Sequence, residues 1–303
     1  MILKYHLEDK ILLFRAIIKG ILTYIPLFER IRLIKKKNSK HSGSNALFCY
    51  TIWLSILIYL KKNNANKIYR IGELGTGGAI GIGICAMLTG MNKYYVLDIE
   101  GSYNIENNLK LLADLVTLFK KETPIIRKFK QLNLTVDNNA FPRNLIMPLY
   151  LDDDFVAEIK EEILSGFKKK KKIIILNPWM SSSNLNLDFI FSRAVMEHVD
   201  KPEIVYSGLT SHIIENGFML HDIEFHSHGI SKYPCGHQRI SNTIWKLISG
   251  KRKYFLNRWK FDDHLKAISE IGFETILAEK TINNTGLEDC VVGGTFLAKK
   301  VAV

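Results

Sequence analysis

Two acidic residues and a run of glycines between positions 73 and 98 have the types and the spacing to hold a nucleotide. Glu73 is followed by Gly75 and Gly77 in a Glu-x-Gly-x-Gly pattern directly after a short apolar run. Glycine lets the backbone approach a ligand closely, because no Cβ blocks that approach. Asp98 closes the next apolar run, where a carboxylate is placed to accept hydrogen bonds from two ribose hydroxyls. These residues predict a nucleotide site.

The elements around this site predict the first half of a β-α-β unit. We expect a strand at 67–74, a glycine loop at 75–81, a helix to 88 and a second strand at 94–97. The N-terminal amides of such a helix point at the same place as the loop. A dinucleotide fingerprint needs a third glycine, but Ile80 stands there. The remaining alternative is a glycine-rich turn that binds no ligand.

The Glu73-x-Gly75-x-Gly77 pattern with Asp98 resembles motif I of the class I S-adenosylmethionine-dependent methyltransferases. The resemblance implies a Rossmann-like α/β sheet with helices on both faces and S-adenosylmethionine as cofactor. It implies that the loop packs against the methionine part of the cofactor and that Asp98 holds the ribose. That cofactor has no pyrophosphate, so a third glycine is not needed. The resemblance extends from Tyr50 to the C-terminus.

A second resemblance to this family lies at 187–200, where an apolar strand ends at Ser192 and Glu197-His198-Val199 follows. Ligands of open α/β sheets bind at the carboxyl ends of strands, so we expect Ser192 and His198 to face the crevice. Some quinone-precursor O-methyltransferases carry a magnesium-recruiting acid three residues before that glutamate. Ala194 stands there, so we expect no metal.

The tripeptide Asn177-Pro178-Trp179 follows a predicted strand at 171–176. It partly resembles the Asn/Asp-Pro-Pro-aromatic motif of amino-methyltransferases that act on adenine in nucleic acid. However, Trp179 takes the second proline position and Met180 the aromatic one. We therefore favour a proline turn, with Trp179 packed near the adenine or the pocket.

Histidines supply the candidate general base. Period-two alternation in a predicted strand at 218–225 puts Asp222, Glu224, His226 and His228 on one side. This is either a metal site or, as we favour, a polar strand end that turns into the pocket. Histidine titrates near neutral pH and accepts a proton readily. His198 follows the fourth strand and His226 the fifth, so both are catalytic candidates.

The polar and aromatic segment 229–260 interrupts the strand pattern and is predicted to be a lid that carries substrate specificity. The run His-x-Ile-x-Phe-x-Ser-His at 221–228, together with Asn257-Arg258, resembles bacterial methyltransferases of surface-glycan or glycolipid synthesis. This implies O-methylation of a sugar or another small hydroxyl acceptor, in polysaccharide biosynthesis. The alternatives are a nucleic-acid methyltransferase, an NAD-dependent oxidoreductase and a non-catalytic scaffold.

The composition limits the class of protein. The 303 residues are 47% hydrophobic, which supports a packed core. The net charge of +12 includes basic runs at 35–37 and 168–172, but no aromatics interleave with them, so we favour a solvated face over nucleic acid. The four cysteines form no Cys-x-x-Cys, which argues against zinc and a disulfide framework and for a reducing, cytoplasmic location.

Residues 1–44 are predicted to form a helical extension, and 45–303 a methyltransferase domain with insertions at about 122–150 and 229–260. The extension has an apolar stripe and should end near Pro26. It either covers the core domain or contacts a membrane peripherally. We favour packing, because apolar residues blur the polar face at Leu13, Ile17 and Leu22. The uncharged run 46–60 is too short to span a bilayer comfortably. The stripe consists of Ile11, Phe14, Ile18, Ile21, Ile25 and Phe28.

The rest of the sequence predicts the other helices and strands of the domain. Helices are predicted at 45–62, 106–121, 152–167 and 261–271, and another helix begins at Lys201 and ends at Asn216-Gly217. A final strand pair is predicted at 272–279 and 293–300, as in the class I methyltransferase fold.

Overall fold

The computed structural model describes residues 2–26, 45–65, 68–99, 103–125, 140–146, 149–182, 184–284 and 289–301. A sheet of seven strands runs through it in the order β3-β2-β1-β4-β5-β7-β6. Strand β7 is antiparallel to β5 and β6, while the other pairs are parallel. The predicted Rossmann-like sheet with a terminal antiparallel pair is confirmed. The strands are β1 (Arg70–Leu74), β2 (Lys93–Leu97), β3 (Ile173–Leu176), β4 (Leu187–Arg193), β5 (Ile213–Glu224), β6 (Phe273–Asn284) and β7 (Asp289–Lys300).

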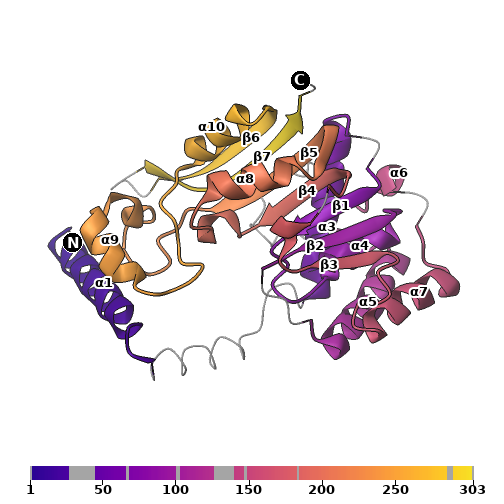
Figure 1. Ribbon diagram of the computed structural model, residues 1–303, viewed down its shortest axis with the longest axis horizontal. Helices are drawn as coiled ribbons and strands as arrows, with labels where there is room; N and C mark the ends of the chain where they lie inside the picture. The colour runs from indigo at the N-terminus through magenta and orange to yellow at the C-terminus, as the bar shows by residue number, and fades with distance from the viewer. Residues whose placement is uncertain are drawn as a thin grey trace.

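Helices cover both faces of the sheet (Figure 1). One face carries α3 (Ala46–Lys62), α4 (Gly81–Leu88) and α5 (Ile105–Lys120), and α6 (Arg143–Ile146) and α7 (Asp153–Leu164) pack beside them. The other face carries α8 (Pro202–Thr210) and α10 (Phe261–Glu270). Side chains of β4 alternate between the two cores, with Phe189 and Phe191 in the first and Ile190 in the second. This alternation is the pleat of a strand that is buried on both sides.

The uncharged run 46–60 forms most of helix α3. Asn45 caps it by accepting a hydrogen bond from the Phe48 amide at 2.9 Å, and every residue from 48 to 60 is buried. Its Trp53 indole donates to Thr89 Oγ1 at 2.8 Å, which fixes α3 against the end of α4. Within the described ranges, no helix is long and apolar enough to cross a membrane.

The predicted helix end at Asn216-Gly217 is wrong. Helix α8 ends at Thr210, and β5 already begins at Ile213. Asn216 adopts a positive φ of 62° inside the strand, where the pairing with β4 shifts register. The Asn-Gly pair thus forms a bulge in β5 and does not end a helix. Bulges and helix ends both use residues that tolerate left-handed backbone. The predicted insertion at 122–150 falls partly outside the described residues, since 126–139 and 147–148 are not among them.

The expectation of no disulfide is also wrong. Cys235 and Cys290 form a disulfide with a Cα–Cα distance of 6.2 Å, although 55 positions separate them in the sequence. The bond joins the 229–260 segment to β7, a long-range contact that spacing along the chain does not reveal. Cys49 and Cys85 are buried and are not part of a disulfide.

The N-terminal helix α1 (Ile2–Leu22) lies apart from the sheet. It packs on α9 (Asn242–Ser249) of the 229–260 segment, as the left of Figure 1 shows. It ends before Pro26, as predicted. However, the stripe expected to pack is exposed, including Ile11 and Phe14; Phe28 lies outside the described residues.

Candidate functional site

The glycine loop after β1 has a backbone that favours glycine. Gly75, Gly77 and Gly78 have φ values of 74°, 66° and 88°, which other residues rarely adopt. The Gly75 amide donates to Leu97 O at 3.0 Å. A Cβ on Gly75 would lie 2.7 Å from Val195 Cγ2. The loop is therefore tied to the end of β2 and to the turn after β4.

Asp98 follows β2 and is 7% exposed. Its Oδ2 accepts hydrogen bonds from Tyr103 OH at 3.2 Å and from Thr76 Oγ1 at 3.4 Å. Its Oδ1 accepts from the Ile99 amide at 2.8 Å. The carboxylate thus already receives two hydroxyl donors, one of them from the glycine loop. The sequence pattern predicts Asp98 but not Thr76 or Tyr103, because nothing in the spacing around these two residues indicates a ligand site.

Glu73 lies behind the loop. Its side chain is buried, and the Tyr94 hydroxyl donates to its Oε2. Burial raises the pKa of Glu73 to about 8, against the hydrogen bond from Tyr94, which lowers it. The Tyr94 ring in turn lies under α4, where a Cβ on Gly83 would come within 2.2 Å of Tyr94 Cε1. Glu73 therefore belongs to the support of the loop, and Gly83 lets α4 lie directly on β2.

Ser192 is the penultimate residue of β4, and its side chain is buried. Its Oγ lies 2.7 Å from His221 Nδ1, and both residues are fully buried. Burial lowers the pKa of His221 to about 3. A second buried pair, Tyr206 OH and His264 Nδ1 at 2.8 Å, lies against it, with the rings of Tyr206 and His221 5.3 Å apart. We predict that Ser192 contacts the cofactor. In the structure its hydroxyl contacts His221, whose ring lies against Tyr206 of α8.

Trp179 is similarly enclosed. It begins the short turn η2 (Trp179–Ser181), which follows the cis peptide bond between Asn177 and Pro178. The indole is buried, packs edge-on against the His212 ring at 5.8 Å, and lies against α8 at Gly208. The proline turn that we favoured is present, and Trp179 holds it on α8.

The turn after β4 places the catalytic candidates. In η3 (Met196–His198), Glu197 is 3% exposed, and neither carboxylate oxygen has a hydrogen-bond partner among the described residues. Burial raises the pKa of Glu197 to about 8. The His198 ring lies 5.6 Å from that of His228, whose Nε2 is 3.6 Å from Glu224 Oε2. In the sequence, Glu197 is only one residue of the Glu197-His198-Val199 motif. Its burial in the structure makes it a candidate functional residue in its own right.

The polar residues predicted on one side of β5 do not share one environment. Asp222 points into the core, where it accepts a hydrogen bond from Thr295 Oγ1 at 2.7 Å and lies 3.5 Å from Arg193 Nε. Burial raises the pKa of Asp222 to about 7. His226 follows the strand and is exposed. Across the ranges that the structure describes, no group of three or more potential ligands could hold a metal.

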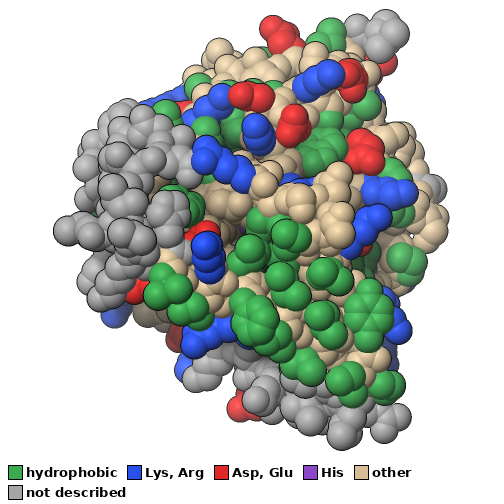
Figure 2. All heavy atoms as spheres, turned by 90° about the vertical axis from the view of Figure 1, so that its left-hand side faces the viewer, with side chains coloured by type: hydrophobic (Ala, Val, Ile, Leu, Met, Phe, Trp, Pro, Cys, Tyr) green, Lys and Arg blue, Asp and Glu red, His purple; other side chains and the backbone are tan. Residues whose placement is uncertain are grey.

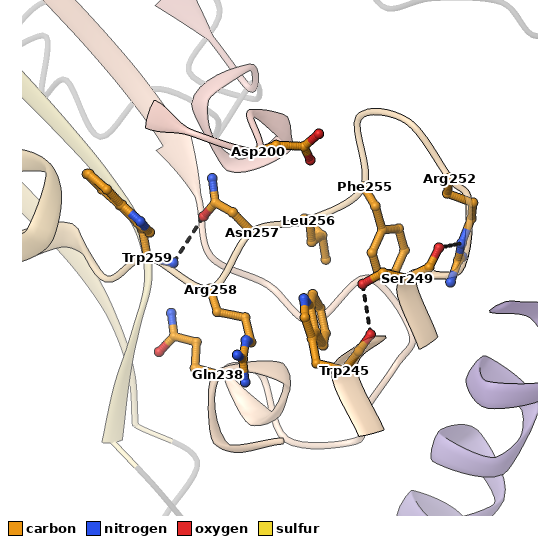
Figure 3. A pocket seen from close by; sticks show the side chains of 10 residues that line it. All are labelled: Asp200, Gln238, Trp245, Ser249, Arg252, Phe255, Leu256, Asn257, Arg258 and Trp259. Atoms are coloured by element: carbon orange, nitrogen blue, oxygen red, sulfur yellow. Dashed lines mark hydrogen bonds between the residues drawn. The ribbon is translucent and has the colours of Figure 1, made fainter. Parts of the chain in front are cut away.

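A cavity of about 510 Å³ adjoins the end of the η3 turn at Asp200 (Figure 3). Asp200 lines it two residues after His198, while the 229–260 segment supplies most of the wall. Asn257 fixes this segment to the turn. Its amide donates to Glu197 O at 2.7 Å, and its Nδ2 donates to Met196 O and Val199 O at 2.7 and 2.9 Å. The other lining residues are Gln238, Trp245, Ser249, Arg252, Phe255, Leu256, Arg258 and Trp259.

No protein-family model and no curated sequence matches the chain. Among solved structures it is similar to an S-adenosylmethionine-dependent methyltransferase of Clostridium acetobutylicum, with 9% identity over 91% of this chain and 100% of that one, at a TM-score of 0.43. A methyltransferase of Methanosarcina mazei has 11% identity, 80% and 98% coverage and a TM-score of 0.42. Magnesium protoporphyrin IX methyltransferase of Synechocystis, with bound SAH, has 12% identity, 93% and 98% coverage and a TM-score of 0.41. Matches at this level say nothing about the activity of the chain.

Proposed function

We propose that the chain is an S-adenosylmethionine-dependent methyltransferase that methylates an oxygen of a sugar or another small hydroxyl acceptor. The observation that carries this proposal is the environment of Asp98. Its carboxylate receives two hydroxyl donors, from Thr76 and Tyr103, at the edge of a left-handed glycine loop. A ribose diol offers the same pair of donors and would exchange with them. Charge-assisted hydrogen bonds of this kind are stronger than neutral ones.

The start of α4 supports this cofactor over a dinucleotide. The Ile80 amide, which begins that helix, already donates to Asn108 Oδ1 at 3.0 Å, and both residues are fully buried. It therefore does not serve as a donor to a pyrophosphate, which dinucleotide sites bind at the helix N-terminus. The Gly75–Gly78 loop and Asp98 would hold the cofactor, with Glu73 behind them. The bound cofactor supplies a methyl group on a positively charged sulfur, so the chain itself must mainly position the acceptor.

The cavity beside the η3 turn supports a hydroxylated acceptor. Its wall combines the aromatic rings of Trp245 and Phe255 with polar groups such as Asp200 and Gln238. Aromatic faces with a few polar groups suit a molecule that has apolar faces and hydroxyl edges. The backbone of the same turn runs from His198 to this wall, so a hydroxyl held there lies near the candidate base.

We propose His198 as the general base that takes the hydroxyl proton, with His226 as the alternative. His198 neighbours His228. The His228 ring, whose Nε2 lies 3.6 Å from Glu224 Oε2, lowers the pKa of Glu224, so Glu224 remains an anion that can orient this pair. His226 follows β5 on the same side as Glu224 and acts on the pKa of that carboxylate. Both positions are consistent with proton removal at the carboxyl edge of the sheet.

The test is calorimetric titration of the full chain with S-adenosylhomocysteine. We expect binding by the unaltered protein and a loss of about tenfold to a hundredfold in affinity for Asp98→Asn, because the charged acceptor is removed. Asp114→Asn, an exposed carboxylate on α5, is the matched control and should bind normally. Unchanged affinity in a folded Asp98→Asn protein, or binding of NADH instead, would refute the proposal. Methyl transfer to monosaccharides then tests the acceptor class.

A further inference from the structure

The outer face of α1 is apolar and open to solvent. It consists of Leu7, Ile11, Phe14, Ile18 and Ile21, with Leu7 61% and Phe14 63% exposed. Leu247 of α9, the helix that packs on α1, is 44% exposed. Figure 2 shows hydrophobic side chains gathered on this side of the molecule, with lysine and arginine side chains near them. A contiguous exposed apolar surface on a folded protein marks an interaction site.

The opposite face of α1 already holds the helix in place, so the fold does not use the outer face. Ala16 packs with Ile248 of α9 in a small core of their own. Gly20 approaches α9 so closely that a Cβ would lie 1.9 Å from Leu247 O. The Lys251 amide donates to Thr23 Oγ1 at 2.8 Å. The helix is thus apolar on two faces, and only one of them is covered by described residues.

Basic side chains outnumber acidic ones around the outer face. Lys10, Arg15 and Lys19 are exposed on α1, and at a hundred degrees per residue they flank the apolar stripe on both sides. Of the two acids of α1, Asp9 is turned toward the 229–260 segment, while Glu8, seven positions before Arg15, lies on the same flank as Arg15 and Lys19. Glu8 pairs with Lys232 at 2.9 Å, and Asp9 accepts hydrogen bonds from Ser231 Oγ and the Lys232 amide at 2.6 and 2.7 Å.

We propose that α1 docks the protein on an anionic lipid bilayer, with its outer face in the boundary between headgroups and acyl chains. A helix with an apolar face and basic flanks binds such a surface through buried apolar area and attraction to anionic lipid. A second copy of the chain is a poorer occupant, because a symmetric contact would bring the same lysine and arginine side chains of both copies together. The net charge of +12 acts in the same direction.

The docking surface adjoins the acceptor cavity through α9. Trp245 and Ser249 of α9 line the cavity, while the Leu247 carbonyl of the same helix lies against Gly20 of α1. In Figure 3 the violet helix at the lower right is α1, beside the cavity wall. On the basis of the proposed function, the acceptor is therefore presented at the membrane, as a sugar on a lipid carrier would be. The docking itself does not depend on that function.

Vesicle flotation of the full chain tests the docking without any substrate. The probes are vesicles of phosphatidylcholine alone and of phosphatidylcholine with phosphatidylglycerol, at low and high salt. We expect binding to the anionic vesicles that weakens with salt, and a loss of at least about tenfold in Phe14→Asp/Ile18→Asp, because two apolar anchors become anionic. Ile204→Asp is the control: it places one such charge on an exposed isoleucine of α8 and should bind like the unaltered protein.

Sedimentation equilibrium and S-adenosylhomocysteine titration accompany the flotation. Cofactor affinity should be the same in all three proteins, which shows that the double variant is folded and separates this proposal from the proposed function. The docking proposal is overturned if the chain does not float with anionic vesicles, or if the double variant floats as well as Ile204→Asp. It is equally overturned if the chain forms a dimer that Phe14→Asp/Ile18→Asp dissociates, because a second copy then covers the face.

Discussion

Replacing Glu197 by glutamine should make the protein more stable at neutral pH, and increasingly so as pH rises. Glu197 is buried, and its carboxylate oxygens have no hydrogen-bond partner within the described parts of the chain. Burial is the main cause that raises its pKa from the model-peptide value of 4.5 to about 8; the backbone amide of Glu197 itself and Arg193 oppose the rise, while Glu224 and Asp222 add to it. The folded protein therefore keeps a proton that the unfolded chain releases.

The sign follows from linkage. A carboxyl whose folded pKa is raised contributes stability fully below its unfolded pKa and loses that contribution as pH rises through the folded pKa. Each pKa unit corresponds to about 1.4 kcal/mol. Between pH 5 and pH 7 the loss for Glu197 is on the order of 2–3 kcal/mol. Glutamine does not titrate, so Glu197→Gln avoids this loss.

The assay is urea unfolding of both proteins at several pH values from 5 to 8, followed by circular dichroism. We expect the difference in free energy of unfolding, Glu197→Gln minus unaltered, to grow by about 2–3 kcal/mol over the interval from pH 5 to pH 7. The buried histidines His221 and His264 are common to both proteins and cancel in this difference. Glu203→Gln, an exposed carboxylate on α8, should give a nearly constant difference. A constant difference for Glu197→Gln too would refute the reasoning.

Two further predictions concern catalysis and packing. His198→Ala should lower turnover by about a hundredfold or more with cofactor affinity nearly unchanged; if it does not and His226→Ala does, the base is His226, and normal turnover of both variants would contradict the assignment. Gly83→Ala should cost about 1–3 kcal/mol in the free energy of unfolding, measured with urea, because its Cβ would overlap the Tyr94 ring. Full stability of Gly83→Ala would show that α4 can move off β2 without penalty.

The sequence predicted the parts of the site that are set by local spacing. Gly75, Gly77 and Asp98 stand where strand, loop and strand place them, and the sheet confirms those elements. It did not predict that Tyr94 binds Glu73 or that Asn257 holds the η3 turn. These contacts join residues far apart in the chain, and each uses a residue type that is common in ordinary turns and strands. The Cys235–Cys290 disulfide could not be predicted for the same reason, because its cysteines are 55 positions apart in the chain.

The N-terminal helix shows a different limit. The sequence pattern predicts that its apolar stripe is the packed face and that Leu13 and Ile17 interrupt the polar face. The structure reverses this order: Leu13 and Ile17 pack with α9, and Ile11 and Phe14 of the stripe face solvent. Periodicity detects that a helix has an apolar face but cannot tell which partner covers it. Gly20 settles the question for the inner face, since only a residue without a Cβ permits the contact with Leu247 O. A helix that already has its packed face, and still keeps an apolar stripe between lysines and arginine, needs a second environment for that stripe.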